Sequence, residues 1–131
     1  MADTSFEDAV QHSLRQDSRY DAGAYEFVRE SLHAAVKRFC NGDEGRHVGG
    51  QELLEGVREH ALKEYGPMAL FILHLWGVKE GLDVGNIVYN LIGAGYFGKS
   101  QGDSLDDFVG GYDFEEAFTK PFLPQNSNSI S

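Results

Sequence analysis

A chain of 131 residues with 21 acidic and 11 basic side chains has a formal net charge of −10, which disfavours binding to a phosphate backbone. Its length suits one domain that folds without a metal, and its single cysteine, Cys40, excludes an internal disulfide. The longest largely apolar run, residues 68–76, is about half of what a bilayer-spanning helix needs. Because the N-terminus lacks a basic and apolar signal, we expect a cytoplasmic protein with no membrane partner.

Three helices with apolar stripes are predicted in the first half of the chain. The segment Thr4-Ser5-Phe6-Glu7 is typical of a capping box and predicts a first helix that ends near Arg15. Asp21 is a suitable N-cap for a second, longer helix. Gly49-Gly50 precedes a third helix that continues to Tyr65.

The run from Gly66 to Phe97 contains two strongly apolar helical patterns. The first, from Pro67 to Trp76, is closed by Gly77, and the second follows Asp83, a possible N-cap. Few residues of the run are charged, so both helices should be buried on most of their surface. We therefore expect them at the centre of the fold, covered by the second and third helices.

The segment from Asp103 to Phe122, called here the aromatic segment, is acidic and rich in large rings. Asp113-Phe114-Glu115-Glu116 predicts the start of a short helix that Pro121 ends. Its rings are Phe108, Tyr112, Phe114, Phe118 and Phe122. Either they pack onto the chain's own helices and seal the core, or they form an interaction surface for a second copy or a basic partner.

Together these patterns predict an all-α fold, a compact bundle of about five helices with a short C-terminal helix. Residues 1–124 would form a single helical domain, and the polar residues 125–131 a disordered tail. The third and fourth helices, joined at Tyr65-Gly66-Pro67, allow a helix-turn-helix-like centre. A DNA-reading helix needs Arg, Lys, Asn or Gln, whereas the fourth helix has only His74 as a polar residue, so nucleic-acid binding is disfavoured.

Two Glu-x-x-His pairs are the candidates for a metal site. Glu30 and His33 have the spacing found in helix-bundle di-iron proteins, and so do Glu44 and His47. Further ligands would have to come from acids such as Glu52 and Glu55. The second pair lies in or beside a glycine-rich loop, and a solvated helix face is the favoured explanation over a metal site.

Cys40 and the glycine-rich run of residues 93–100 suggest no catalytic chemistry. Cys40 lies near the end of the second helix, where the helix dipole disfavours a thiolate, although His47 is within reach along the chain. The glycine run ends a helix, whereas a phosphate-binding loop follows a strand and opens a helix. We therefore predict no catalytic residue and no cofactor.

Several segments resemble a bacterial family of conserved hypothetical proteins restricted to Planctomycetes and Verrucomicrobia (Minf type). They are His47-Val48-Gly49-Gly50-Gln51-Glu52-Leu53-Leu54-Glu55-Gly56, Tyr65-Gly66-Pro67-Met68-Ala69, Asn86-Ile87-Val88-Tyr89-Asn90-Leu91 and Tyr112-Asp113-Phe114-Glu115-Glu116-Ala117-Phe118. The resemblance covers roughly Tyr20 to Phe122. It implies a bacterial, cytosolic protein, and it implies no activity and no catalytic residue.

Abundant apolar and aromatic residues and scarce catalytic groups favour a non-enzymatic helical protein that acts through protein–protein interaction or self-assembly. The alternative is a small metal- or ligand-binding helical protein, and the third possibility is a DNA-associated regulator. The partner would be an unidentified protein or a second copy of the chain.

Overall fold

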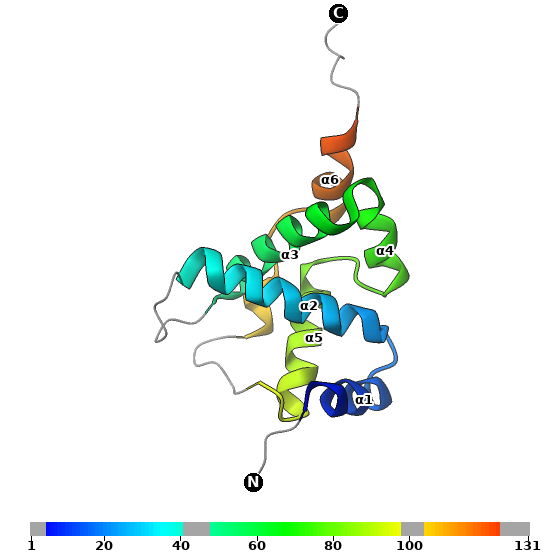
Figure 1. Ribbon diagram of the computed structural model, residues 1–131, viewed down its shortest axis with the longest axis vertical. Helices are drawn as coiled ribbons and strands as arrows, with labels where there is room; N and C mark the ends of the chain where they lie inside the picture. Colours follow the sequence, from blue (N-terminus) through cyan, green and yellow to red (C-terminus); the bar gives the residue numbers. More distant parts are fainter. Residues whose placement is uncertain (1–4, 41–47, 98–103, 124–131) are drawn as a thin grey trace, which may run out of the picture.

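The computed structural model describes residues 5–40, 48–97 and 104–123 (Figure 1). The α-helices are α1 (Phe6–Gln16), α2 (Ala22–Ala35), α3 (Gly50–Tyr65), α4 (Ala69–Leu75), α5 (Gly81–Gly93) and α6 (Phe114–Thr119). One π turn, η1 (Val36–Cys40), extends α2, and the 3₁₀ turns are η2 (Gly66–Met68), η3 (Leu105–Phe108) and η4 (Lys120–Phe122). The described residues contain no strand, so the all-α prediction is confirmed; the predicted tail, residues 125–131, lies outside them.

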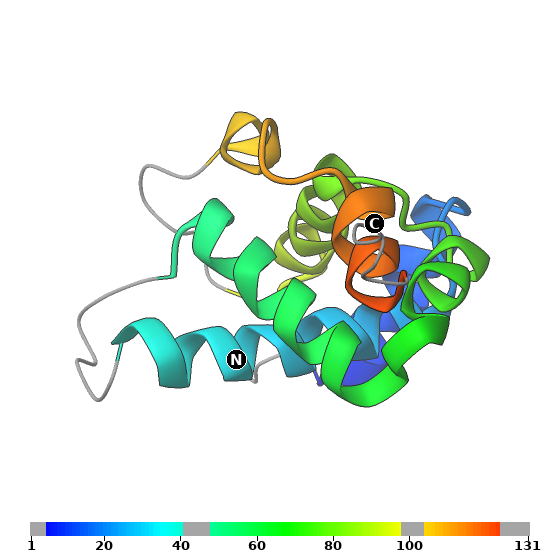
Figure 2. The same ribbon diagram turned by 90° about the horizontal axis from the view of Figure 1, so that it is seen from above.

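The hairpin of α2 and α3 is the largest helix–helix contact. The two helices run side by side in opposite directions (Figures 1 and 2). They approach closely at Gly56, where an added Cβ would lie 2.7 Å from the Ser31 carbonyl oxygen and 3.0 Å from the Ala35 Cβ. Any larger residue at position 56 would therefore push the two helices apart.

The hydrophobic core is continuous, and every α-helix contributes to it. Its largest fully buried side chains include Tyr25, Phe27, Leu54, Ile87 and Phe118. The helix α5 crosses behind α2 in Figure 1. The turn η3 packs against the N-terminal half of α5. The predicted central position of the fifth helix therefore agrees with the structure.

Two predicted N-caps differ from the observed ones. The capping box Thr4-Ser5-Phe6-Glu7 predicts Thr4 as the cap of the first helix, whereas the observed cap of α1 is Ser5, whose hydroxyl accepts a hydrogen bond from the backbone N–H of Asp8. The helix α5 begins at Gly81, and Asp83 lies inside its first turn, where its carboxylate accepts from the N–H groups of Lys79 and Glu80. The carboxylate still satisfies free N–H groups at the start of the helix, but from the N3 position rather than from the cap.

The predicted burial of the fourth helix is wrong. The α-helical part is short, from Ala69 to Leu75. Its only fully buried side chains are those of Ala69 and Leu73. It lies at the edge of the bundle, against α3 and α6 (Figure 1). Its remaining apolar residues therefore face outward or lie only partly covered.

No helix in the described ranges has the length and apolar character needed to cross a membrane.

Candidate functional site

The most unusual feature of the surface is the exposed side of α4 and the turn before it. Three large apolar side chains lie there: Met68 is 51% exposed, Phe71 60% and Leu75 69%. Their spacing of three and four residues places them on one stripe, opposite the buried pair Ala69 and Leu73. We call Met68, Phe71 and Leu75 the α4 face.

The local sequence fixes this orientation at both ends of the helix. Pro67 occupies the first turn of η2, where its missing N–H costs no hydrogen bond. At the other end Gly77, with φ +92°, donates to the His74 carbonyl, and Val78 donates to the Leu73 carbonyl. This is a Schellman motif, and the side chain of Val78 is buried, at 1% exposure, as its apolar contact.

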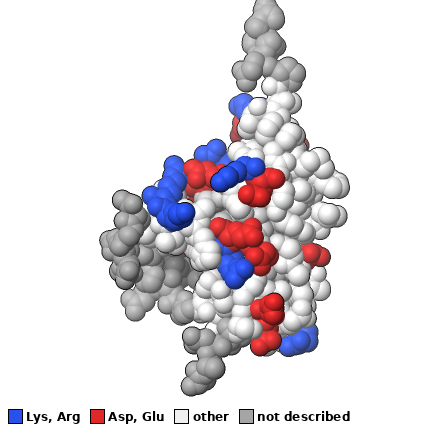
Figure 3. Space-filling view, in the orientation of Figure 1, with Lys and Arg blue, Asp and Glu red and all other residues white. Residues whose placement is uncertain are grey.

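Charged side chains are absent from the whole stretch around the α4 face, residues 66–78. In the space-filling view the surface over α4 is white, whereas acidic and basic side chains intermingle over α2 and α3 (Figure 3). Among the exposed residues of α4 itself, only His74 is polar. The surface can therefore gain from apolar burial and offers no ion pair of its own.

The aromatic segment packs mainly onto the chain itself. The side chains of Phe108, Phe114 and Phe118 are at most 5% exposed, and Phe114 and Phe118 stack edge to face at 5.3 Å. The half-buried Tyr112 donates its hydroxyl to the Leu54 carbonyl at 2.5 Å, and burial raises its pKa. These four rings therefore seal the core, as in the first of the two interpretations; only Phe122, 45% exposed, remains available as surface.

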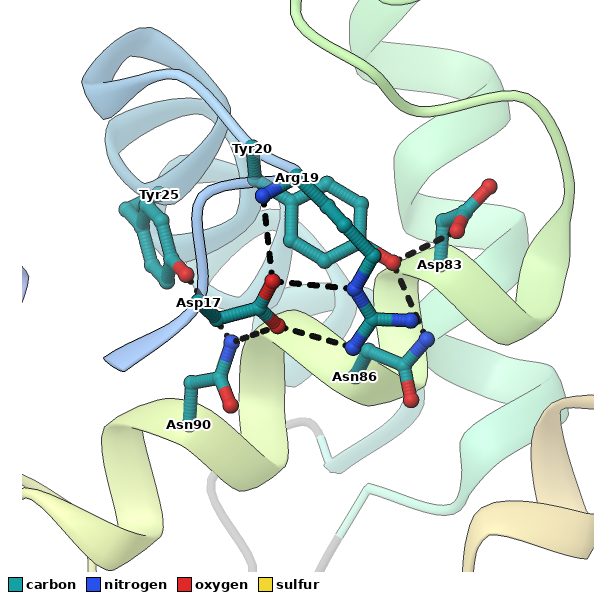
Figure 4. A network of polar contacts seen from close by, with 7 residues as sticks. All are labelled: Asp17, Arg19, Tyr20, Tyr25, Asp83, Asn86 and Asn90. Carbon is teal, nitrogen blue, oxygen red and sulfur yellow. Dashed lines mark hydrogen bonds and ion pairs between the residues drawn. The ribbon is translucent and has the colours of Figure 1, made fainter. Parts of the chain in front are cut away.

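A polar network joins the loop between α1 and α2 to α5 (Figure 4). Asp17 accepts from the Arg19 guanidinium at 2.8 and 2.9 Å and from the Asn90 amide at 3.0 Å. Tyr20 donates to Asp83 at 2.5 Å and accepts from Asn86 at 2.9 Å. Both carboxylates in the network already have hydrogen-bond partners. We therefore interpret it as a structural network that holds the loop against α5, and not as a ligand-binding site.

The pKa values in this network shift because the groups are paired and partly buried. The hydrogen bonds from the Arg19 side chain hold the pKa of Asp17 well below its usual range against the opposing effect of burial, and the Asn90 amide lowers it further. Burial and the bond to Asp83 raise the pKa of Tyr20. Both shifts keep Asp17 ionised and Tyr20 protonated at neutral pH, which preserves the network.

The predicted metal ligands do not come together in the part of the chain that the structure describes. Glu30 hydrogen-bonds to the Nε2 atom of His60 on α3 at 2.9 Å, and His33 is exposed. Glu44 and His47 lie outside the described residues. Over the described ranges no three His, Cys, Asp or Glu residues are placed to hold one ion.

The remaining candidate ligands serve the helix that carries them. Glu52 accepts from the N–H of Gly49, which completes the start of α3, and Glu55 pairs with Arg58 at 2.7 Å. Cys40 is buried at the end of η1. A shallow hollow of about 470 Å³ between α3 and α6 contains Arg58 and Lys120, but each is already paired with a glutamate of the same helical stretch.

Comparison of the chain with models of known families, with curated proteins and with solved structures gave no match. The family resemblance therefore stays a proposal, and the surface of the molecule alone indicates how the protein acts.

Proposed function

We propose that this protein acts through protein–protein interaction, without catalysis, and that the α4 face is its binding surface. The observation that carries the proposal is the exposure of three large apolar side chains on one helical stripe, each more than half accessible. Taking about 200 Å² for a large side chain, the stripe exposes on the order of 350 Å² of apolar surface per chain. The largest apolar patch of a monomer is of this order and is often functional.

The cytoplasmic location and the bacterial family resemblance belong to the same proposal. The resembling segment Tyr65-Gly66-Pro67-Met68-Ala69 leads into α4 and includes the first residue of the α4 face. The aromatic segment supports the proposal less well. Three of its five rings are buried in the chain's own core, and a fourth, Tyr112, is hydrogen-bonded to the chain's own backbone.

The metal-binding alternative now depends on Glu44 and His47. The candidate ligands that the structure describes are either bonded to other residues or not placed together to hold an ion. For DNA binding, α4 offers no Arg, Lys, Asn or Gln to a base edge. No observation favours either function over interaction through the α4 face.

Photochemical cross-linking tests the binding surface without knowledge of the partner. A photoreactive phenylalanine analogue is placed at Phe71 in one variant and at Phe122 in another, and each protein is produced and irradiated in cells. We expect one dominant adduct from position 71, which Leu75→Asp on the same face removes. Absence of an adduct at position 71, or an adduct that Leu75→Asp leaves unchanged, would contradict the proposal.

A further inference from the structure

The α4 face has a shape that its own copy can match. Met68 and Leu75 are seven residues apart, about 10 Å along a helix, and Phe71 lies between them. If a second α4 lies antiparallel across a two-fold axis, Met68 meets Leu75 of the second copy and the two Phe71 rings meet near the axis. A two-fold interface requires this kind of self-complementary patch.

Charge limits where two copies can meet. Each chain has a formal net charge of −10, so most relative orientations bring like charges together. The other exposed large apolar residues of the described chain all lie within three residues of a charged side chain in the sequence. Val36 precedes Lys37, Leu105 precedes Asp106, Val109 lies two residues after Asp107, and Phe122 and Leu123 closely follow Lys120. Residues 66–78 contain no Asp, Glu, Lys or Arg, so the α4 face itself brings no like charge into a contact between two acidic chains.

The same observation counts against a basic partner at this face. A basic peptide gains its specificity from carboxylates placed around an apolar anchor. On α4 the only exposed polar side chain is His74, and the helix contributes no carboxylate. The electrostatic term therefore gives a basic partner no advantage over a second copy in contact with α4 itself.

On this basis, and resting on the proposed function of the α4 face, we infer that its partner is a second copy of this chain, packed α4 against α4 in antiparallel orientation. The apolar area, on the order of 350 Å² per copy, is below the roughly 800 Å² per partner of a stable interface. The dimer is therefore weak and forms in a concentration-dependent way.

Light scattering of the full chain tests the dimer from about 10 μM to about 1 mM, a range that brackets a weak interface. We expect the mass to rise from 14.5 kDa toward twice that value. Phe71→Asp and Leu75→Asp should stay monomeric throughout, while the control Val109→Asp, changed at a residue that is 56% exposed, should still dimerise. Circular dichroism verifies that each variant is folded.

A covalent trap tests the geometry independently. Under mild oxidation Phe71→Cys, placed near the two-fold axis, should form a disulfide-linked dimer, whereas Val109→Cys should not. The unmodified chain, in which Cys40 is buried, gives the background level of disulfide-linked dimer. A dimer that persists in Phe71→Asp, or equal trapping at positions 71 and 109, would overturn the inferred arrangement.

A chain that is monomeric at every concentration would overturn the inference but leave the proposed function standing if position 71 cross-links to a different protein in cells. A monomer that also gives no adduct at position 71 would overturn both.

Discussion

The end of α4 depends on one glycine whose backbone and surroundings both exclude a side chain. Gly77 has φ +92°, and an added Cβ would lie 2.2 Å from the Arg19 carbonyl oxygen. We expect Gly77→Ala to lower the free energy of unfolding by about 1–3 kcal/mol, through backbone strain and displacement of the loop before α2. Urea unfolding followed by circular dichroism measures the change.

Gly93 is the matched control for this substitution. It ends α5, and an added Cβ would meet nothing within 4 Å. We expect Gly93→Ala to leave stability unchanged or to raise it by up to about 1 kcal/mol, because alanine favours the helix. Equal losses in the two variants would mean that the contact with Arg19 does not set the cost at Gly77.

The carboxylate of Asp17 makes stability depend on pH. Its pKa is lower in the folded chain than in the unfolded one, so its contribution is complete above about pH 4 and declines as the pH falls toward the folded-state value. The Asp17 side chain is only 12% exposed, but Arg19 is 61% exposed, so solvent screens the pair. We therefore expect Asp17→Asn to cost about 1 kcal/mol at pH 7.

Urea unfolding of the two proteins at a series of pH values measures this difference. The gap between wild type and Asp17→Asn should shrink steadily once the pH is below about 4. A gap that stays constant down to acid pH would show that the lost packing or hydrogen bonding, rather than the charge of Asp17, accounts for the effect.

Among the helices, α4 shows what an apolar pattern can and cannot predict. Its existence and its end at Gly77 follow from local chemistry and are found in the structure, whereas the predicted start at Gly66-Pro67 is the 3₁₀ turn η2 and the α-helix itself begins at Ala69. Its burial does not follow, because a helix that is apolar on every side has no period to show which stripe faces the core. Only the packing against α3 and α6 selects Ala69 and Leu73 as the inner pair.

Two substitutions on α4 test this orientation. Leu73 is fully buried, so Leu73→Asp places an unpaired charge in the core and should unfold the chain. Phe71 is 60% exposed, so Phe71→Asp should stay folded with a change of about 1 kcal/mol or less. Circular dichroism and thermal melting distinguish these outcomes, and an unfolded Phe71→Asp would contradict the outward placement of the α4 face.

The aromatic segment provides a second pair of substitutions. Phe118 is fully buried and packs edge to face with Phe114, so Phe118→Ala should lower the free energy of unfolding by about 3–5 kcal/mol. Phe122 is 45% exposed on η4, so Phe122→Ala should cost about 1 kcal/mol or less. Urea midpoints measure both; a small effect at Phe118 would mean that α6 does not seal the core.

At the scale of the whole molecule, the connections that were not predicted are those between residues distant in sequence. Asp17 and Asn90 form a hydrogen bond across 73 positions, and Tyr20 and Asp83 across 63. Each of these residues has an ordinary local role, as a loop or helix residue, so its own neighbours give no sign of the partner. Helix boundaries depend on nearby residues and are predictable from one sequence, whereas the choice of partners depends on the assembled packing.

The net charge of the whole chain sets the salt dependence of the inferred dimer. Two chains of charge −10 repel each other, and the α4 face contributes no ion pair to offset the repulsion. Added NaCl screens this repulsion, so the dimer should tighten severalfold between about 50 mM and about 500 mM salt. NaCl is preferable to sulfate, because excluded anions such as sulfate strengthen apolar burial by themselves.

Sedimentation equilibrium at the two salt concentrations measures the dissociation constant. Phe71→Asp, which should be monomeric in both, shows whether salt promotes association through some other surface. A dimer that weakens as NaCl rises would contradict the uncharged interface, because that response requires attraction between opposite charges across the contact. The sign of the salt effect therefore distinguishes an apolar contact between two α4 helices from an interface formed by the charged residues of α2, α3 or α6.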